Sequence, residues 1–370
     1  MATLYFHIPF CKRICSYCDF YKVGAVELLP RVVEMMHREL DERQDYLHSK
    51  SLTSIYFGGG TPSLLNPEDI EELIAHARRL FDCSAVDEIT IEANPDDLTD
   101  EYVKRLGMTS VNRVSLGVQS FDDRVLRFMN RRHSAEDAER AVERLRGVGI
   151  VNLSIDIIFG VAGFGEEHLM ESLRRAIALD VGHISAYHLT IEERTRLGLL
   201  MRKGEYVPIS EELSEEEFLA VHSALVGAGY DHYEVSNFAK RGCRAKHNSA
   251  YWSGVEYLGI GAGAHSFSRD NRTWCVSTAK EYSEGCFHFE DEVLSEQDHI
   301  NEYVMTQLRT SNGVDLEFVA ERYGEGEAQR LLRSAKPWLE SGAVRQTANR
   351  LVIPSDKFLL SDAVIESLFA

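Results

Sequence analysis

Three cysteines near the N-terminus are the residues of this chain best suited to chemistry. Cys11, Cys15 and Cys18 have three and then two residues between them. A single loop with this spacing can place three thiolates at three corners of a cuboidal iron–sulfur cluster. Asp19 and Phe20 stand where a fourth nearby cysteine would close the site. The fourth iron would then stay open to a small molecule, and chemistry takes place at an open metal position.

A zinc site and a disulfide framework are the other uses of clustered cysteines. Structural zinc takes four ligands, usually from two short pairs. His7 could complete a Cys3His set, but its spacing to Cys11 matches no common zinc finger. The odd total of seven cysteines and the composition of an intracellular protein argue against disulfides. The spacing therefore favours a cluster, with zinc or unligated thiols as the alternatives.

The composition is that of a soluble globular protein. Of 370 residues, 44% are hydrophobic and 27% charged, enough for one large α/β domain with an appendage or for two domains. No apolar run approaches the ~18 residues of a membrane span, and the N-terminus enters a strand at once. We therefore expect a cytoplasmic protein with no transmembrane segment. The net charge of −19 argues against a nucleic-acid partner.

The first 195 residues or so alternate short β-branched runs with amphipathic helical segments. The predicted helices include 30–47, 66–81 and a segment that begins at Ser134. Six βα units imply a parallel sheet with helices outside, and six strands are too few to close an eight-stranded barrel. We predict a partial (β/α)6 barrel with the strands Leu4–His7, Ser54–Phe57, Glu88–Glu92, Arg113–Gly117, Leu153–Ile158 and His183–His188.

The pattern changes after about residue 195. A charged helix at Glu211–Val226 precedes a strand at Tyr230–Val235 and a glycine-rich stretch at 259–266. The tail reads as helices followed by a β-hairpin at Gly342–Ile353, which would suit a winged-helix-like α+β domain. We predict three regions: the barrel core at 1–195, a barrel extension at 196–295 and a C-terminal domain at 296–370.

Polar or glycine residues stand where several predicted strands end. They are the stretch 58–62 (Gly-Gly-Gly-Thr-Pro), Glu92, Gln119 and Asp156. Because reactive groups of barrels sit at the carboxyl ends of the strands, we expect these residues at one rim beside the cysteine loop. Glu92 ends an apolar run, where a carboxylate is costly unless paired; a solvated carboxylate is the alternative. Asp156 should be buried and paired, with Arg131 as its expected partner.

Five segments resemble the motifs of a known superfamily. The cysteine loop and the glycine stretch resemble the radical S-adenosylmethionine (SAM) superfamily. From about residue 3 to the C-terminus, the chain resembles the oxygen-independent coproporphyrinogen III oxidase-like proteins regarded as heme chaperones (HemW). The segments that carry the resemblance are YFHIPFC at 5–11, YCDF at 17–20, FGGGTP at 57–62, SLGVQSF at 115–121 and HNSAYW at 247–252.

The resemblance implies a 4Fe–4S cluster on Cys11, Cys15 and Cys18, with SAM bound to the fourth iron. One electron from the cluster would cleave the SAM sulfonium and release a 5′-deoxyadenosyl radical. The implied SAM contacts are Tyr5, Tyr17, Gly59, Gly60, Thr61, Glu92 and His265. Four further residues correspond to those that hold a second SAM in the oxidases, with a structural polar network as the alternative: Gln119, Arg131, Asp156 and Thr190.

The resemblance also implies a heme site. In the chaperone branch the segment at 247–252 is associated with heme, which makes His247, Tyr251 and Trp252 candidate heme contacts. A packing role for His247 is the alternative. Cys243 is a second candidate ligand or tether. Nearby cations could pair with the heme propionates, although a solvated surface explains such a cluster as well: Lys240, Arg241, Arg244 and Lys246.

Departures from the oxidase pattern favour a chaperone. Phe20 replaces the last cysteine of the oxidase motif, and the oxidases' N-terminal extension has no counterpart before the first strand. The stretches 160–163 (Gly-Val-Ala-Gly) and 191–195 lack family prolines, which puts efficient SAM cleavage in doubt.

The sequence therefore predicts a cytoplasmic heme chaperone with a heme acceptor protein as partner. A flavodoxin or ferredoxin would be the electron donor if the protein is redox active. The alternatives are a radical SAM enzyme, such as a coproporphyrinogen dehydrogenase, and a cluster-bearing scaffold without SAM chemistry.

Overall fold

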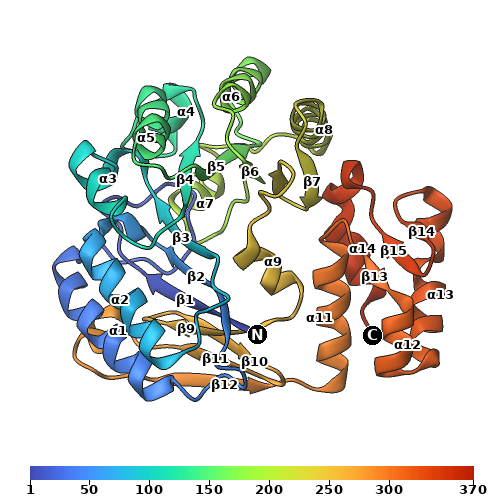
Figure 1. Cartoon of the computed structure of the whole chain (residues 1–370). Helices are drawn as coiled ribbons and strands as arrows, with labels where there is room; N and C mark the ends of the chain where they lie inside the picture. The colour runs from blue at the N-terminus through green and yellow to red at the C-terminus, as the bar shows by residue number, and fades with distance from the viewer.

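Six parallel strands alternating with helices form the first half of the chain (Figure 1). The structure is a computed structural model and describes residues 1–370, apart from the side chain of Glu166. All six predicted strands are present: β1 (Ala2–Ile8), β2 (Leu52–Gly59), β3 (Glu88–Ala93), β4 (Arg113–Gln119), β5 (Asn152–Phe159) and β6 (His183–His188). The helices are α1 (Leu29–Arg43), α2 (Pro67–Leu80), α3 (Asp100–Leu106), α4 (Asp123–Phe128), α5 (Ala135–Gly147), α6 (Glu166–Ala178) and α7 (Arg196–Arg202).

These six strands are the centre of a twelve-stranded sheet with the order β12-β11-β10-β9-β1-β2-β3-β4-β5-β6-β8-β7. β9 pairs parallel with β1, and β8 pairs antiparallel with β6. The later strands are β7 (Asp231–Glu234), β8 (Asn237–Ala239), β9 (Glu256–Ile260), β10 (His265–Ser268), β11 (Asn271–Cys275) and β12 (Phe289–Val293). The sheet ends at β12 and β7 and stays open, which confirms the partial barrel. Strands that follow residue 195 extend it at both edges.

Side chains on the barrel strands alternate between an apolar outer face and a polar inner face. Leu4, Phe6 and Ile8 of β1 are fully buried in the core beneath the outer helices, which Figure 1 shows as an arc around the strands. The intervening Tyr5 points to the opposite face, because side chains of a strand alternate. Its ring lies 6.1 Å from that of Tyr56 on β2. The inner face thus carries polar groups rather than a packed apolar filling.

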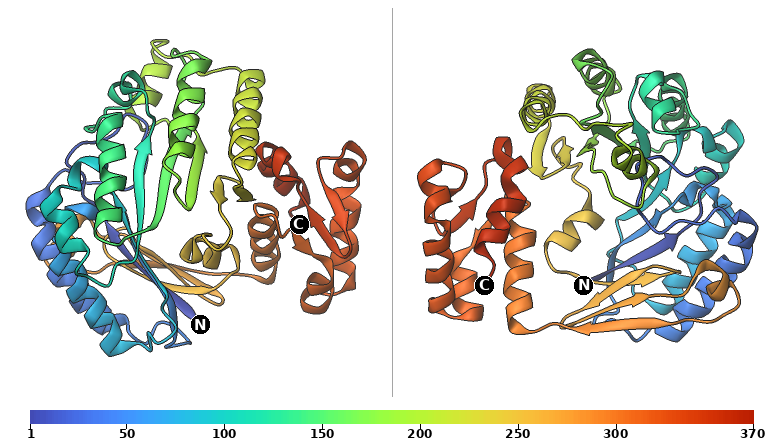
Figure 2. Two further views of the ribbon diagram at one scale, coloured as in Figure 1. Left: turned by 45° about the horizontal axis from the view of Figure 1, so that its top comes forward. Right: turned by 180° about the vertical axis from the view of Figure 1, so that it is seen from behind.

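A short helix occupies the inner side of the sheet. The helices of this region are α8 (Glu211–Gly227), α9 (Lys246–Trp252) and α10 (Ala279–Ser283). Figure 1 shows α9 within the arc of strands, and Figure 2 shows the same placement from two other sides. The carboxylate of Glu88 on β3 accepts the backbone N–H groups of Lys246 (3.0 Å) and His247 (2.9 Å). A carboxylate at a helix N-terminus is stabilising, so Glu88 fixes where α9 begins.

The C-terminal residues form a small domain with its own sheet, to one side of the barrel (Figure 2). Its elements are α11 (Glu296–Leu308), β13 (Val314–Asp315), α12 (Leu316–Tyr323), α13 (Glu325–Ser341), β14 (Arg345–Thr347), β15 (Arg350–Val352) and α14 (Ser361–Leu368). The sheet order is β13-β15-β14, and β14 and β15 form the predicted hairpin. Helix, strand, two helices and hairpin follow one another as in a winged helix. No helix among the described residues is long and apolar enough to cross a membrane.

Candidate functional site

The cysteine loop is held against the carboxyl ends of the strands by contacts from two other segments, the residues after β2 and the α4–α5 connection. Cys11 Sγ accepts a hydrogen bond from the Thr61 hydroxyl (3.4 Å) after β2, and Cys15 Sγ accepts one from Arg131 (3.3 Å) before α5. Asn130 donates to the backbone carbonyl of Ile14 (2.7 Å). These contacts fix the position of the loop, and its cysteines form no disulfide.

The three thiols share one cavity with most of the predicted SAM residues. The cavity measures about 600 Å³ and lies at the carboxyl ends of the parallel strands. Its lining includes Cys11, Cys15, Cys18, Tyr17, Gly59, Gly60, Thr61, Glu92, Gln119, Arg131, Asp156 and Thr190. Residues more than 170 positions apart in the sequence thus line the same cavity, as expected at the rim of a barrel.

Tyr5 and His265 lie outside this lining. Tyr5 sits deeper, on the inner face of β1, where its hydroxyl and His7 Nδ1 are 2.9 Å apart. His265 is an exposed residue at the start of β10, and its ring stacks on Trp274 with 5.9 Å between centroids. Contact of these two residues with SAM stays a prediction.

The glycine stretch is required by close packing as well as by ligand access. Gly59 has φ +110°, and a Cβ there would lie 2.7 Å from the imidazole of His7. A Cβ on Gly60 would lie 2.8 Å from the carbonyl oxygen of Phe10. Gly60 also donates its N–H to the carbonyl of Ile8 (2.8 Å). These glycines therefore let β2 and the start of the cysteine loop approach each other, besides presenting backbone groups to the cavity.

Glu92 is a partly buried hydrogen-bond acceptor at the cavity wall. Its carboxylate accepts hydrogen bonds from the Tyr56 hydroxyl (2.8 Å) and from the N–H of Gly59 (3.2 Å). Burial raises the pKa of Glu92 to about 7, while these two hydrogen bonds act in the opposite direction. The expected pairing of this carboxylate is thus provided by a tyrosine and a backbone amide.

Arg131 pairs with the cysteine loop instead of Asp156, contrary to our expectation. Its guanidinium donates to Cys15 Sγ, to Asn94 Oδ1 (2.6 Å) and to the carbonyl of Gly117 (2.6 Å). Burial raises the pKa of Asp156 to about 6, opposed mainly by a hydrogen bond from Ser185 and by the charge of Arg113. Local sequence could not show that Arg131 reaches across the rim to a cysteine.

Sequence reasoning placed Gln119 at the rim but missed its backbone conformation, and it missed Asn94 altogether. Gln119 has φ +70°, a left-handed conformation that is costly for a residue with a side chain and that clusters at functional sites. Asn94 bridges the site, because it donates to the Thr61 hydroxyl (3.3 Å) and accepts from Arg131. The sequence signal for a role of Asn94 at the site was its position two residues after Glu92.

The donor set fits an iron–sulfur cluster better than a single ion. Three free, partly buried thiols line the same cavity. Among the described residues, no group of three His, Cys, Asp or Glu side chains is arranged to hold one metal ion. A cluster places each cysteine on a different iron and does not need the thiols to converge on a point. Arg131 and Thr61 supply the hydrogen bonds to sulfur that accompany cluster ligands.

His247 is buried inside the barrel, and both of its ring nitrogens lie within hydrogen-bond distance of a hydroxyl. It is 1% exposed, and Nδ1 lies 2.8 Å from the Ser54 hydroxyl, while Nε2 lies 3.0 Å from the Tyr251 hydroxyl. Its ring stacks on Tyr56 with 4.9 Å between centroids. Burial lowers the pKa of His247 to about 3, so the imidazole is neutral near pH 7. Tyr56 links this histidine to Glu92, because its ring stacks on His247 and its hydroxyl donates to Glu92.

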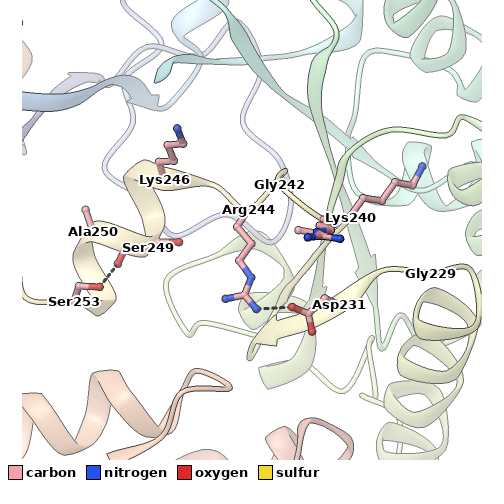
Figure 3. A pocket seen from close by; sticks show the side chains of 11 residues that line it. Gly229, Asp231, Lys240, Gly242, Arg244, Lys246, Ser249, Ala250 and Ser253 are labelled. Carbon is pink, nitrogen blue, oxygen red and sulfur yellow. Dashed lines mark hydrogen bonds and ion pairs between the residues drawn. The ribbon is translucent and has the colours of Figure 1, made fainter. Parts of the chain in front are cut away.

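The basic segment 240–246 lines a second cavity at the opposite end of the strands. This cavity of about 660 Å³ contains Lys240, Arg241, Arg244 and Lys246 (Figure 3). Three of these cations are paired: Lys240 with Asp180, Arg244 with Asp231, as the dashed line in Figure 3 marks, and Lys246 with Asp87. Pairing with carboxylates of the chain itself leaves little charge for heme propionates here.

Comparison with known proteins identifies the class of this fold and site. The sequence pattern of the Radical SAM superfamily matches residues 5–176, and that of the HemN C-terminal domain matches residues 294–355. The structure resembles that of coproporphyrinogen III oxidase (HemN) from Escherichia coli, with a TM-score of 0.84 over 100% of this chain and 90% of that one at 20% identity. The fold, the cysteine loop and the rim cavity define a radical SAM protein.

Two relatives of nearly equal length narrow this class. The chain is 35% identical over 98% of its length to the heme chaperone HemW of Bacillus subtilis, of which 98% is covered. It is 31% identical over 99% of its length to the heme chaperone HemW of Mycobacterium tuberculosis strain H37Rv, of which 94% is covered. The chain belongs to the HemW family.

Proposed function

We propose that this protein is a cytoplasmic heme chaperone, which binds heme and transfers it to an acceptor protein. The observation that carries the proposal is the match to HemW proteins over nearly the whole chain. Both the barrel and the C-terminal domain share in that match. We propose that the chain is divided into three regions: the barrel core at 1–195, the barrel extension at 196–295 and the C-terminal domain at 296–370.

We further propose that the rim cavity holds a 4Fe–4S cluster and exchangeable SAM. Cys11, Cys15 and Cys18 would be the cluster ligands, and the bound pair supplies one-electron chemistry at the SAM sulfonium. Glu92 accepts hydrogen bonds at the cavity wall, where SAM presents hydroxyl and amine donors. Arg131 places a positive charge 3.3 Å from the sulfur of Cys15, which favours the reduced state of a bound cluster.

A radical SAM enzyme, such as a coproporphyrinogen dehydrogenase, is the second candidate. One observation favours this enzyme: the three cysteines and most of the predicted SAM residues line the same cavity. Radical chemistry on SAM needs the cluster and SAM side by side. Such an enzyme would need an electron donor such as flavodoxin or ferredoxin. Phe20 in place of the last cysteine of the oxidase motif favours the chaperone.

One experiment separates the two candidates. The full chain is reconstituted anaerobically with iron and sulfide, reduced, and incubated with SAM and coproporphyrinogen III. A parallel sample is titrated with hemin. We expect saturable hemin uptake and no vinyl product. Conversion of coproporphyrinogen to a vinyl product would overturn the chaperone proposal and support the enzyme.

A further inference from the structure

A groove between the barrel and the C-terminal domain is distinct from the rim cavity and adjoins the second cavity at Ser253, which lines both. We call it the aromatic groove. It has a volume of about 980 Å³ and is lined by the end of α9, the β9–β11 strands, α11, α12 and β15. This volume lies at the upper end of the ~300–1,000 Å³ typical of small-molecule sites. Tyr251 and Trp252 line it, whereas His247 of the same helix points into the barrel interior.

Aromatic rings gather on both sides of this groove. On the barrel side, the Tyr251 and Tyr257 rings meet edge-on at 4.7 Å, and Phe267 lies 6.2 Å from Tyr257. On the C-terminal side, Tyr303 and Phe318 lie 4.7 Å apart. Phe318 is 42% exposed and the other four rings are partly exposed. Exposed rings that converge on a groove indicate a ligand with a large apolar face.

The two sides are joined by direct contacts, so the groove is a built feature of the fold. Gln307 of α11 donates to the backbone carbonyl of Trp252 (2.7 Å). Arg272 of β11 pairs with Glu302 of α11 (2.7 Å). Figure 1 shows α9 and α11 next to each other, with the β10–β12 strands alongside.

Four arginines and four carboxylates line the groove, and two of the arginines have no close ion pair among the described residues. Arg272 and Arg350 are engaged, by Glu302 and by Asp315 (2.6 Å) respectively. Arg269 has only a long contact of 3.7 Å to Glu256, whose carboxylate already lies 2.8 Å from His48. Arg322 contacts the ring of Tyr323 and, within the described part of the chain, forms no ion pair. Arg269 and Arg322 are therefore available for the carboxylates of a ligand.

Two polar atoms at the groove lack hydrogen-bond partners. The buried Nε1–H of Trp252 has no acceptor among the described residues. His299 Nε2 makes no hydrogen bond, although it lies 3.1 Å from Asp270 Oδ1 in an ion-pair contact of poor geometry. Asp270 is 72% exposed on the β10–β11 turn, so it can move aside without disturbing the core. An imidazole with an uncommitted nitrogen is a suitable iron ligand.

We propose that the aromatic groove is the heme site of this protein. The His299 imidazole would ligate the iron, the rings of Tyr251, Tyr257 and Phe318 would contact the macrocycle, and Arg269 and Arg322 would pair with the propionates. Heme is the ligand class that combines a large apolar plane, two edge carboxylates and a metal that accepts an imidazole. This inference rests on the proposed heme-chaperone function and changes the role of His247 from ligand to structural residue.

The test is a hemin titration of the full-length protein, followed by the Soret band, with three variants. His299→Ala should shift the Soret band and weaken binding, and Arg322→Glu should weaken binding roughly tenfold by replacing a favourable charge contact with repulsion. Arg244→Glu, at the second cavity, is the matched charge control and should bind hemin as the wild type does. Circular dichroism melting of each variant checks that the fold is retained.

The outcomes separate this inference from the proposed function. If the wild type shows no saturable hemin binding, the chaperone function fails and the groove assignment fails with it. If the wild type binds hemin and both His299→Ala and Arg322→Glu bind equally well, only the groove assignment is overturned. It is also overturned if a folded His247→Gln variant loses the Soret band of the bound heme while His299→Ala keeps it.

Discussion

At the scale of single residues, Glu92 connects the chemistry of the cavity with the barrel interior. Its carboxylate accepts from Tyr56, whose ring stacks on His247, and it faces the cavity that contains the three cysteines. Because burial raises its pKa to about 7, the charge of Glu92 changes within the physiological range. A ligand that donates hydrogen bonds to this carboxylate binds the ionised form more tightly, because hydrogen bonds to a charged acceptor are stronger.

SAM affinity should therefore rise with pH. When the pH lies below the Glu92 pKa of about 7, the carboxyl group must lose its proton before SAM binds tightly. One titrating group with this pKa predicts SAM binding about tenfold weaker at pH 6 than at pH 8. Isothermal titration of the reconstituted protein measures the effect. Glu92→Gln is the control, because it cannot ionise and reveals the contribution of SAM's own amine. Equal pH dependence in the two proteins would remove Glu92 from the SAM site.

His247 should contribute to stability more than to any ligand. His247→Ala would leave the Ser54 and Tyr251 hydroxyls without their buried partner, at a cost of roughly 1–3 kcal/mol. Urea unfolding followed by circular dichroism provides the measurement. Asn248, the next residue on α9, is partly exposed, and Asn248→Ala is the matched control. An unchanged free energy of unfolding for His247→Ala would contradict the structural role.

At the scale of elements, the cysteine loop and α9 are both positioned by long-range contacts. The loop depends on the residues after β2 and on the α4–α5 connection, whereas α9 depends on the carboxylate of Glu88 at the start of β3. The barrel core beneath them is apolar and continuous, and it contains none of the three cysteines. The fold is therefore expected to survive loss of a cluster.

Cys15→Ala should abolish the cluster and leave the fold intact. Removal of one of three thiolates prevents assembly, but Cys15 is only partly buried and the core does not rest on it. The visible absorbance of the reconstituted protein should fall to the baseline, while the melting temperature of the unreconstituted protein stays within a few degrees of wild type. Cys243→Ala, outside the loop, serves as the control. Global unfolding of Cys15→Ala would instead make the loop a structural element.

At the scale of the whole molecule, local patterns predicted much of the fold but not its edges. The six parallel strands and the Ser134 capping box of α5 follow from short-range periodicity and capping chemistry, and both are present. The parallel pairing of β9 with β1 joins segments some 250 residues apart. No local pattern specifies such a pairing, because it depends on how the completed sheet curves.

The same limit applies to the site. The positions of Glu92 and Thr61 after predicted strands placed both residues at the rim, because the carboxyl ends of parallel strands meet there. Both residues do line the rim cavity. The contact of Arg131 with Cys15 was missed because it depends on the path of the α4–α5 connection. For His247 the sequence left a heme contact and a packing role both open, because a histidine in a short helix looks the same in sequence whichever way it points. The structure places its ring in the barrel interior.

The account as a whole depends on an iron–sulfur cluster held by the cysteine loop. The most direct measurement is the iron, acid-labile sulfide and zinc content of protein purified without oxygen, together with its Mössbauer spectrum. We expect about four iron and about four sulfide per chain, with the spectrum of a 4Fe–4S cluster. Stoichiometric zinc without sulfide would contradict the account.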